Sequence, residues 1–422
     1  AHMFEVSGDL DEPALVAAIS RFETMKAQAA AAQARASVLL ASKRRAAEES
    51  LGVPARRRGR GLAAEIALAR RDSPARGGRH LGFAQALVDE MPHTLAALES
   101  GALSEWRATL IVRESACLDV EDRRTLDAEL CADSASLEGK GDARIAAEAK
   151  SIAYRLDPHA VVDRAVRAAK ERTVTVRPAP DCMSYVTALL PMDQGVSVYA
   201  ALRRAADTNA DERSRGQVMA DTMVSRVTGR EPGEASPIAV NLVLTDDSLF
   251  GDAEDPARVA GFGPVPAGVA RALVVAADAA GRATLRRLYA HPKSGALVAM
   301  ESKARLFPRG LAAFIRQRDE TCRTPYCDAP IRHIDHVHSA GTGGGTAADN
   351  GEGLCEACNY TKEADGWRVT AHTDENGTHT TELTTPTGAR HRSQAPPLPG
   401  RRNLDISRVE WLLSTRIGKE AA

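Results

Sequence analysis

Residues 322–367 read CRTPYCDAPIRHIDHVHSAGTGGGTAADNGEGLCEACNYTKEADGW, and this stretch carries the strongest structural signal in the chain. Two close pairs of cysteines bracket its centre, Cys322 with Cys327 and Cys355 with Cys358. Close pairs with such spacings are typical of a tetrahedral zinc site with four thiolate ligands. Two disulfides are the alternative, but nothing in the sequence indicates export. We therefore predict one structural zinc ion, whose four thiolates leave no coordination position for a substrate.

The residues between the cysteine pairs predict a small mixed structure. Alternating branched apolar residues at 331–337 indicate a short strand that ends at an Asp-His pair. The glycine-rich run at 339–346 cannot hold regular structure and predicts a loop. Residues 356–364 favour a helix. Strand, loop, a second extended piece and helix, held by thiolates at both ends, make a compact scaffold.

A set of polar residues in this scaffold is poorly suited to packing and well suited to chemistry: Asp335, His336, Asn350 and Asn359. The expected arrangement brings Asp335 opposite Asn359, and two hard oxygen ligands of this kind can hold a divalent cation that keeps open water positions. Side chains alternate along a strand, so His336 should point to the other face. It can then act as a base without being a metal ligand.

With these residues in place, the stretch resembles an HNH endonuclease of the ββα-metal group. The resemblance implies that Asp335 and Asn359 bind a catalytic Mg²⁺ or Mn²⁺ ion, or another divalent transition metal. It implies that His336 is the general base that activates water and that Asn350 orients it. Lys362 stands where such modules often place a cation that binds phosphate. The chain departs from the pattern at Asn359, where the family frequently has histidine, and this leaves the preferred metal open.

The resemblance implies an enzyme that hydrolyses phosphodiester bonds in DNA, with RNA as the second choice of substrate. A single site nicks one strand, so a double-strand break needs a homodimer or two successive visits. The alternative is a zinc-containing DNA-binding or assembly protein that does not cleave. An Asp-His pair alone is weak support for catalysis, and His333 reads most simply as a solvated histidine. His338 stands where proline is common, and its role is open.

Length and composition indicate a globular protein. The chain has 422 residues, room for two or three domains. Aromatic residues make up only 4% of it, so the core should rely on Ala, Leu and Val in close-packed helices. The sequence contains no apolar run of membrane length and no signal peptide. We therefore expect a cytoplasmic protein without membrane contacts, with Cys117, Cys131 and Cys182 as reduced thiols.

Charge is distributed unevenly along the chain. The net charge is −1, which neither favours nor excludes nucleic acid. Residues 43–79, however, contain eleven lysines and arginines against four acidic residues, a difference of +7. Such a segment suits contact with phosphates. The candidate DNA contacts are Arg56, Arg57, Arg58 and Arg60. The alternative is a solvated junction between helices.

The fold class that we predict is α+β, with a large, mainly helical N-terminal region and small β-hairpins before a zinc-stapled ββα-metal module. The expected divisions are a remnant of cloning at residues 1–3, a helical domain at 4–172, a mixed α+β region at 173–300, the nuclease module at 301–370, and a β-hairpin, proline-rich connector and terminal helix at 371–422.

Individual elements can also be predicted. A long helix should run from Pro13 to about Glu49, with apolar residues at spacings of three and four on its buried side: Leu15, Ile19, Phe22 and Met25. A hairpin is expected at 173–190. Further strands are expected near 238–244, 283–289 and 296–300, and an amphipathic helix at 406–413.

The N-terminal region also carries a resemblance. The motifs GFAQAL at Gly82–Leu87 and LSEWRA at Leu103–Ala108 resemble a domain of unknown function found mainly in high-GC bacteria, where it precedes a C-terminal HNH module. The first 300 residues contain no phosphate-cradling glycine loop and no nucleophile elbow. The resemblance therefore supports the architecture and brings no activity of its own.

Overall fold

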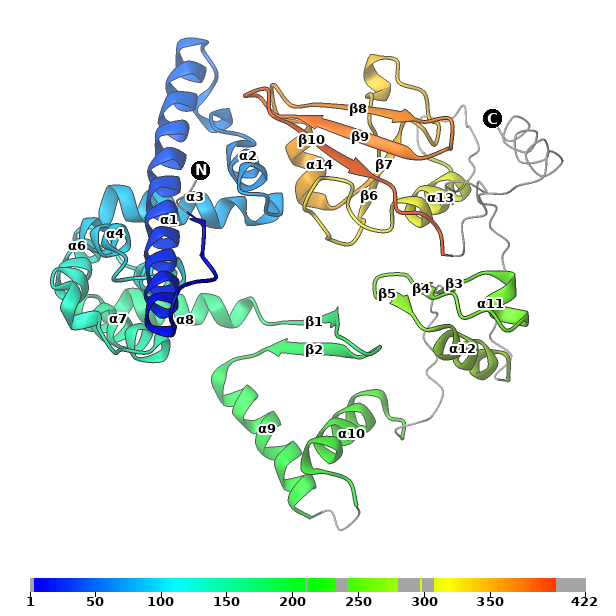
Figure 1. Cartoon of the computed structure of the whole chain (residues 1–422), viewed down its shortest axis with the longest axis horizontal. Coiled ribbons are helices and arrows are strands. Elements are labelled where there is room, and N and C mark those ends of the chain that lie inside the picture. Colours follow the sequence, from blue (N-terminus) through cyan, green and yellow to red (C-terminus); the bar gives the residue numbers. More distant parts are fainter. Residues whose placement is uncertain (1–3, 209–211, 232–241, 280–296, 298–306, 400–422) are drawn as a thin grey trace. The chain divides into compact units, whose positions relative to one another are not determined.

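The computed structural model describes residues 4–208, 212–231, 242–279, 297 and 307–399 (Figure 1). The chain forms two compact units, residues 1–167 with 360–366, and residues 168–359 with 367–422. It is mainly helical, with small antiparallel sheets in its C-terminal part, as the sequence predicts. None of the described helices is both long enough and apolar enough to span a membrane.

The α-helices are α1 (Glu12–Ser50), α2 (Leu62–Ala69), α3 (Gly77–Gln85), α4 (Pro92–Ser100), α5 (Glu105–Ser115), α6 (Val120–Cys131), α7 (Asp142–Leu156), α8 (Pro158–Lys170), α9 (Met192–Asp207), α10 (Arg215–Thr228), α11 (Asp246–Phe250), α12 (Ala267–Ala279), α13 (Arg309–Asp319) and α14 (Glu356–Lys362). The strands are β1 (Thr173–Pro178), β2 (Ser184–Leu189), β3 (Leu242–Val243), β4 (Ala257–Val259), β5 (Gly263–Val265), β6 (His333–His336), β7 (Gly351–Leu354), β8 (Arg368–Thr373), β9 (His379–Thr384) and β10 (Arg390–Gln394).

The long helix α1 forms where the sequence predicts it. The Asp11 carboxylate caps it by accepting a 2.9 Å hydrogen bond from the backbone N–H of Ala14. The predicted buried stripe is wrong, because the side chain of Ile19 is 69% exposed. Alanines are buried instead, and those at 27–34 pack against leucines of α4 and of the π-helical turn Ala86–Glu90. Small side chains let helix backbones approach closely. The side of α1 that packs against other helices is therefore the one lined by alanines, and not the one that carries its large apolar side chains.

A second hydrophobic core is formed by helices α4, α5, α6 and α7. Its fully buried members include Met91, Ile111, Leu126 and Ile145. Asp127, also fully buried, accepts hydrogen bonds from the backbone N–H groups of residues 93 and 94 at the start of α4. This carboxylate therefore satisfies helix-terminal donors that would otherwise be buried without partners.

The middle of the chain contains two small sheets. Strands β1 and β2 form the predicted hairpin, with Thr173 opposite Leu189. Strands β3, β4 and β5 form an antiparallel sheet, of which β3 is the described part of the strand predicted near 238–244. The strands predicted near 283–289 and 296–300, apart from residue 297, lie outside the described residues, as does the helix predicted at 406–413.

The C-terminal part combines two antiparallel sheets with α13 and α14. Strands β6 and β7 pair from His333 opposite Leu354 to His336 opposite Gly351, and α14 follows directly. Strands β8, β9 and β10 form one sheet with β9 at its centre, so residue 370, the expected division, lies inside β8. The predicted turn between β8 and β9 is present, and the Asp374 carboxylate accepts hydrogen bonds from two of its backbone N–H groups.

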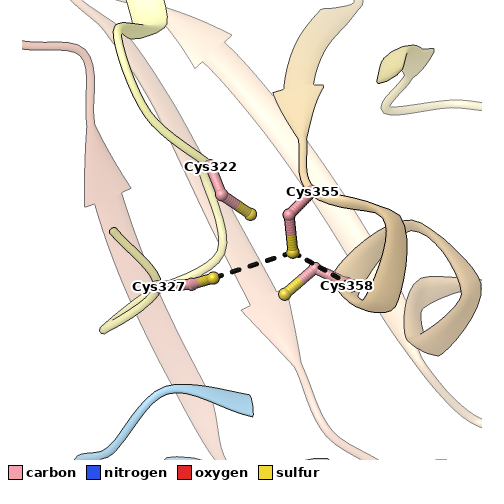
Figure 2. Close-up of side chains that lie close together, drawn as sticks. All are labelled: Cys322, Cys327, Cys355 and Cys358. Carbon is pink, nitrogen blue, oxygen red and sulfur yellow. Dashed lines mark hydrogen bonds between the residues drawn. The ribbon is translucent and has the colours of Figure 1, made fainter. Parts of the chain in front are cut away.

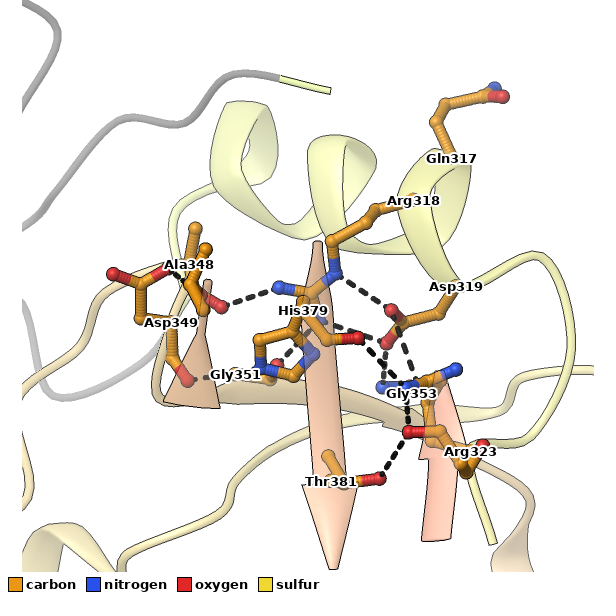
Figure 3. A network of polar contacts seen from close by, with 12 residues as sticks. Gln317, Arg318, Asp319, Arg323, Ala348, Asp349, Gly351, Gly353, His379 and Thr381 are labelled. Carbon is orange, nitrogen blue, oxygen red and sulfur yellow. Dashed lines mark hydrogen bonds and ion pairs between the residues drawn. The ribbon is translucent and has the colours of Figure 1, made fainter. Parts of the chain in front are cut away.

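A buried group of three charges joins these elements (Figure 3). Asp319, at the end of α13, is 2% exposed, and Arg318 and Arg323 are 5% and 3% exposed. The Arg318 guanidinium contacts both oxygens of the Asp319 carboxylate, at 2.7 and 3.1 Å. Nε of Arg323 lies 3.7 Å from the same carboxylate. A single buried carboxylate, that of Asp319, is therefore the counter-ion of two buried guanidinium groups.

Backbone groups supply further partners in this network, although Nε of Arg323 makes no hydrogen bond among the described residues. Arg318 donates to the carbonyls of Ala348 and Gly351, each at 2.6 Å. The backbone N–H of Gly353 donates to the Asp319 carboxylate at 2.7 Å. Arg323 donates to the carbonyl of Ser393, at 2.7 Å, just before the end of β10. The network thus ties α13 to β7 and the cysteine loop to the β8–β10 sheet.

Replacing Asp319 by Asn should destabilise this part of the chain strongly. The variant leaves two guanidinium groups buried without their counter-ion, and removal of one partner of such a pair typically costs about 3–5 kcal/mol. Hydrogen–deuterium exchange in peptides covering β6 and β7 measures the loss, with peptides of α6 as internal reference. The control is Glu99→Gln, which breaks the exposed Arg35–Glu99 pair and should cost at most about 1 kcal/mol. Equal protection in both variants would contradict this account.

Candidate metal centre and hydrolytic site

The four cysteines of the quoted stretch come together (Figure 2). Their sulfurs lie within 4.8 Å of one another, and all four residues are buried. Sγ of Cys327 and Sγ of Cys355 are 3.8 Å apart. Four sulfurs bound at about 2.3 Å to one tetrahedral zinc ion would be about 3.8 Å apart. The cluster can therefore hold a zinc ion, as the sequence predicts.

Local backbone bonds position these thiols. The N–H of Cys322 donates to the carbonyl of Ala329, and the N–H of Arg323 donates to the carbonyl of Gly353 in β7. Neighbouring thiols raise the pKa of Cys322 and of Cys358, chiefly through hydrogen bonds with Cys327 and with Cys322 respectively. Four thiolates crowded together need a cation to offset their charge, and a coordinating metal ion deprotonates thiols outright.

The pairing of β6 with β7 sets the direction of the predicted site residues. Asp335 lies opposite Glu352, so their side chains point to one face of the hairpin. His336 lies opposite Gly351 and points to the other face. This separation agrees with the sequence prediction that the acid and the base of the Asp-His pair face different ways. Glu352, which is 2% exposed, is a carboxylate on the Asp335 face that the sequence analysis missed.

Two contacts hold the imidazole of His336. Its Nε2 lies 2.9 Å from the hydroxyl oxygen of Thr346, and its ring centroid lies 4.5 Å from that of Phe307. Gly351 makes this packing possible, since a Cβ there would lie 2.4 Å from Ile315 and 2.8 Å from Phe307. The sequence offered no signal for Phe307, while Thr346 could have been noticed as the polar end of the glycine run.

Asn350 holds the loop between β6 and β7. Its amide nitrogen donates to the carbonyls of His338 and Gly345, at 2.9 and 2.7 Å. Its side-chain oxygen accepts a 2.8 Å hydrogen bond from the N–H of His338. Both donors of the amide are thus used on loop backbone, and one of these bonds fixes the residue that precedes Thr346. The side-chain contacts of Asn350 are to loop backbone, and the imidazole of His336 is bonded to Thr346 instead.

Asn359 lies in α14 directly after Cys358. Its backbone N–H donates to the carbonyl of Cys355, as expected in the first turn of a helix. Its side-chain oxygen Oδ1 is buried and has no hydrogen-bond partner among the described residues. A buried polar atom without a partner is costly, which suits an oxygen that serves as a metal ligand. Lys362 occupies the last turn of the same helix and is partly exposed.

The basic segment 43–79 has mixed roles. Several of its arginines form ion pairs within the helical unit, including Arg44 with the buried Glu65. Arg58 is also engaged, since it donates to the carboxylate of Glu49 and to the carbonyl of Val53. The side chains of Arg56, Arg57 and Arg60 are exposed. Part of this segment therefore stabilises the helical unit, and its exposed arginines remain candidates for phosphate contact.

A protein-family model covers residues 19–319 of the chain. It describes a domain of unknown function, DUF222. The chain belongs to this family. The match confirms the predicted resemblance of the N-terminal region to a domain of unknown function, and it ends at the last residue of α13. No curated protein and no solved structure matches the chain.

Replacing Cys355 by Ser should abolish metal binding at the thiolate cluster. Thiolate ligation contributes on the order of 10 kcal/mol to the folding of small zinc modules, so we expect residues 322–364 to lose protection from proteases while α1–α7 keep theirs. Elemental analysis of protein purified without chelators should give one zinc per parent chain and none for the variant. The matched control is Cys131→Ser, which removes a buried thiol outside the cluster. A parent protein without zinc would contradict the assignment.

Proposed function

We propose that the chain is a metal-dependent DNA endonuclease of the HNH type, in which the DUF222 region binds or targets DNA. The observation that carries the proposal is the buried, unpartnered Oδ1 of Asn359 on the helix that follows the β6–β7 hairpin. That hairpin presents Asp335 and His336 from adjacent positions. A carboxylate, an imidazole and an amide oxygen on one cysteine-stapled ββα unit are the parts that phosphodiester hydrolysis needs.

The residues present fit a divalent cation at Asp335 and Asn359. Carboxylate and amide oxygens are hard ligands, and two of them leave coordination positions for water and phosphate. When bound, a Mg²⁺- or Mn²⁺-type ion would supply Lewis-acid stabilisation of charge on the leaving oxygen. The thiolate cluster would be structural, because four cysteines complete a tetrahedral shell.

His336 is the base in this proposal. A neutral imidazole at cellular pH can take the proton of the attacking water. The ring is half-buried and held between the Thr346 hydroxyl and Phe307, which limits its rotation. Asn350 would contribute by fixing the loop that carries Thr346, and Lys362 would neutralise a phosphate oxygen.

Replacing His336 by Ala should reduce plasmid nicking by about 10²–10⁴-fold, the typical contribution of a general base. Nicking is measured with added Mg²⁺, Mn²⁺ or Ni²⁺, and zinc content should not change. The matched control is His338→Ala, which removes a nearby exposed imidazole from the loop. A His336→Ala variant that keeps more than about a tenth of the parent rate would mean that another group is the base. A parent that binds DNA without nicking it under any of these metals would favour the alternative, a DNA-binding zinc protein that does not cleave.

Replacing Arg56, Arg57 and Arg60 together by Gln should make DNA binding less sensitive to salt. Each lost phosphate contact lowers the slope of log K against log salt by about 0.9, so the three can remove up to about 2.7. Fluorescence anisotropy with a DNA duplex measures the slope. Arg58→Gln serves as control, because its guanidinium is partly buried and bonded to Glu49 and to the carbonyl of Val53, whereas the ion pair of Arg57 with Asp365 is exposed to solvent. An unchanged slope in the triple variant would identify the segment as a solvated face.

A further inference from the structure

The β8–β10 sheet has an outer face that the hydrolytic site does not use. Strand register brings Arg368, Thr384 and Arg390 into one row across the sheet. The next row contains Thr370, Glu382 and Arg392. Residues directly opposite one another point to the same side, and so do alternate residues along a strand. We call these six residues the arginine face.

The alternation of burial along β8 and β10 shows that the arginine face points to solvent, although Thr380, in the next row on the same side of β9, is 5% exposed. Leu383 lies on the opposite side of the sheet and is 7% exposed. His391 and Ser393 alternate with the two exposed arginines of β10, and both are partly buried. Arg323 of the cysteine loop donates to the carbonyls of Ser393 in β10 and His379 in β9. The alternation of burial therefore makes the arginine face the solvent-exposed side of the sheet.

Positive charge dominates the arginine face. The side chains of Arg390 and Arg392 are 73% and 76% exposed, and Arg368 is also exposed. Glu382 is the single acid in the two rows; its carboxylate lies 2.9 Å from Arg392 and 3.6 Å from Arg390. The hydrogen bond from Arg392 lowers the pKa of Glu382, so this carboxylate is ionised at neutral pH. Three positive charges against one leave a net charge of +2 on the arginine face.

The chemistry of the arginine face is polar throughout. Among the described residues, no large apolar side chain exposed to solvent lies on β8, β9 or β10. An anionic membrane surface would be better served by basic residues mixed with apolar ones that enter the lipid. Guanidinium groups and threonine hydroxyls without apolar neighbours are instead the groups that contact DNA phosphates.

We propose that the arginine face binds the phosphate backbone of duplex DNA, as a surface separate from the hydrolytic residues. The proposal rests on the proposed function for the choice of DNA as partner. Arg368, Arg390 and Arg392 contact phosphate oxygens, and the carboxylate of Glu382 competes with the phosphates for Arg390 and Arg392. The contacts are to the backbone, so they add affinity and fix orientation without selecting a base sequence.

The test compares the full-length parent with Arg368→Gln/Arg390→Gln/Arg392→Gln. Binding to a DNA duplex is followed by fluorescence anisotropy over a range of salt concentrations, without added divalent metal. The slope of log K against log salt should fall by up to about 2.7 in the triple variant. The matched control is Arg113→Gln/Arg144→Gln/Arg155→Gln, which removes three exposed arginines from the helical unit and the same total charge. Its slope should fall by less than that of the arginine-face variant, since these arginines lie outside the candidate contacts Arg56, Arg57 and Arg60.

A second variant, which is expected to strengthen DNA binding, keeps the test independent of folding defects. Glu382→Gln raises the charge of the arginine face and should tighten DNA binding at low salt, with zinc content unchanged. Equal slopes for both triple variants, or weaker binding by Glu382→Gln, would overturn the proposal. The proposal would also be overturned if the arginine-face variant lost the parent's binding to vesicles of anionic lipid but kept its DNA binding. Plasmid nicking by the parent is measured separately: a falling slope in a protein that does not nick keeps the DNA surface and rejects the hydrolytic function.

Discussion

The ion group of Arg318, Asp319 and Arg323 is the constraint on which the C-terminal part depends. Removing three charged groups from water is costly, and the cost is offset only when the buried donors and acceptors find partners. Here partners come from β7, β9, β10 and the carbonyl of Ala348, while Nε of Arg323 makes no hydrogen bond among the described residues and keeps only the 3.7 Å ion pair with Asp319. Burial lowers the pKa of Arg323, and the neighbouring carboxylates of Asp319 and Glu352 partly oppose that shift. The elements that carry the candidate site are therefore placed by electrostatics as much as by apolar packing.

The same logic explains the neutral histidine beside this group. His379 is 1% exposed, and its Nε2 lies 3.0 Å from the carbonyl oxygen of Asp349. Burial and the positive charge of Arg318 lower its pKa to about 4. A third cation in this position would lack a counter-charge, so the imidazole stays neutral at neutral pH. The hydrogen bond between this ring and the carbonyl of Asp349 also helps to place the loop between β6 and β7, which carries Thr346, the hydrogen-bond partner of His336.

Sequence patterns predicted the local features of the chain and missed those made by distant residues. The cysteine spacing, the strand at Asp335 and the helix at Asn359 follow from local chemistry, and the structure contains all of them. The contact of His336 with Phe307 depends on how α13 packs, which no local pattern encodes. In α1 the periodicity of large residues selected Ile19, but close packing of helices favoured alanines. A stripe of large apolar residues predicts the buried side of a helix only when the neighbouring helices leave room for large side chains.

The family match ends at Asp319, and this has a consequence for how the protein can be divided. The last residues of the matched region are also the buried electrostatic centre of the part that follows it. The border of sequence similarity is therefore not a border between independent folding units. A C-terminal module exchanged between relatives could not be joined at residue 320. It would have to bring its own α13, because the acid that neutralises the arginine of the cysteine loop belongs to the helix before it.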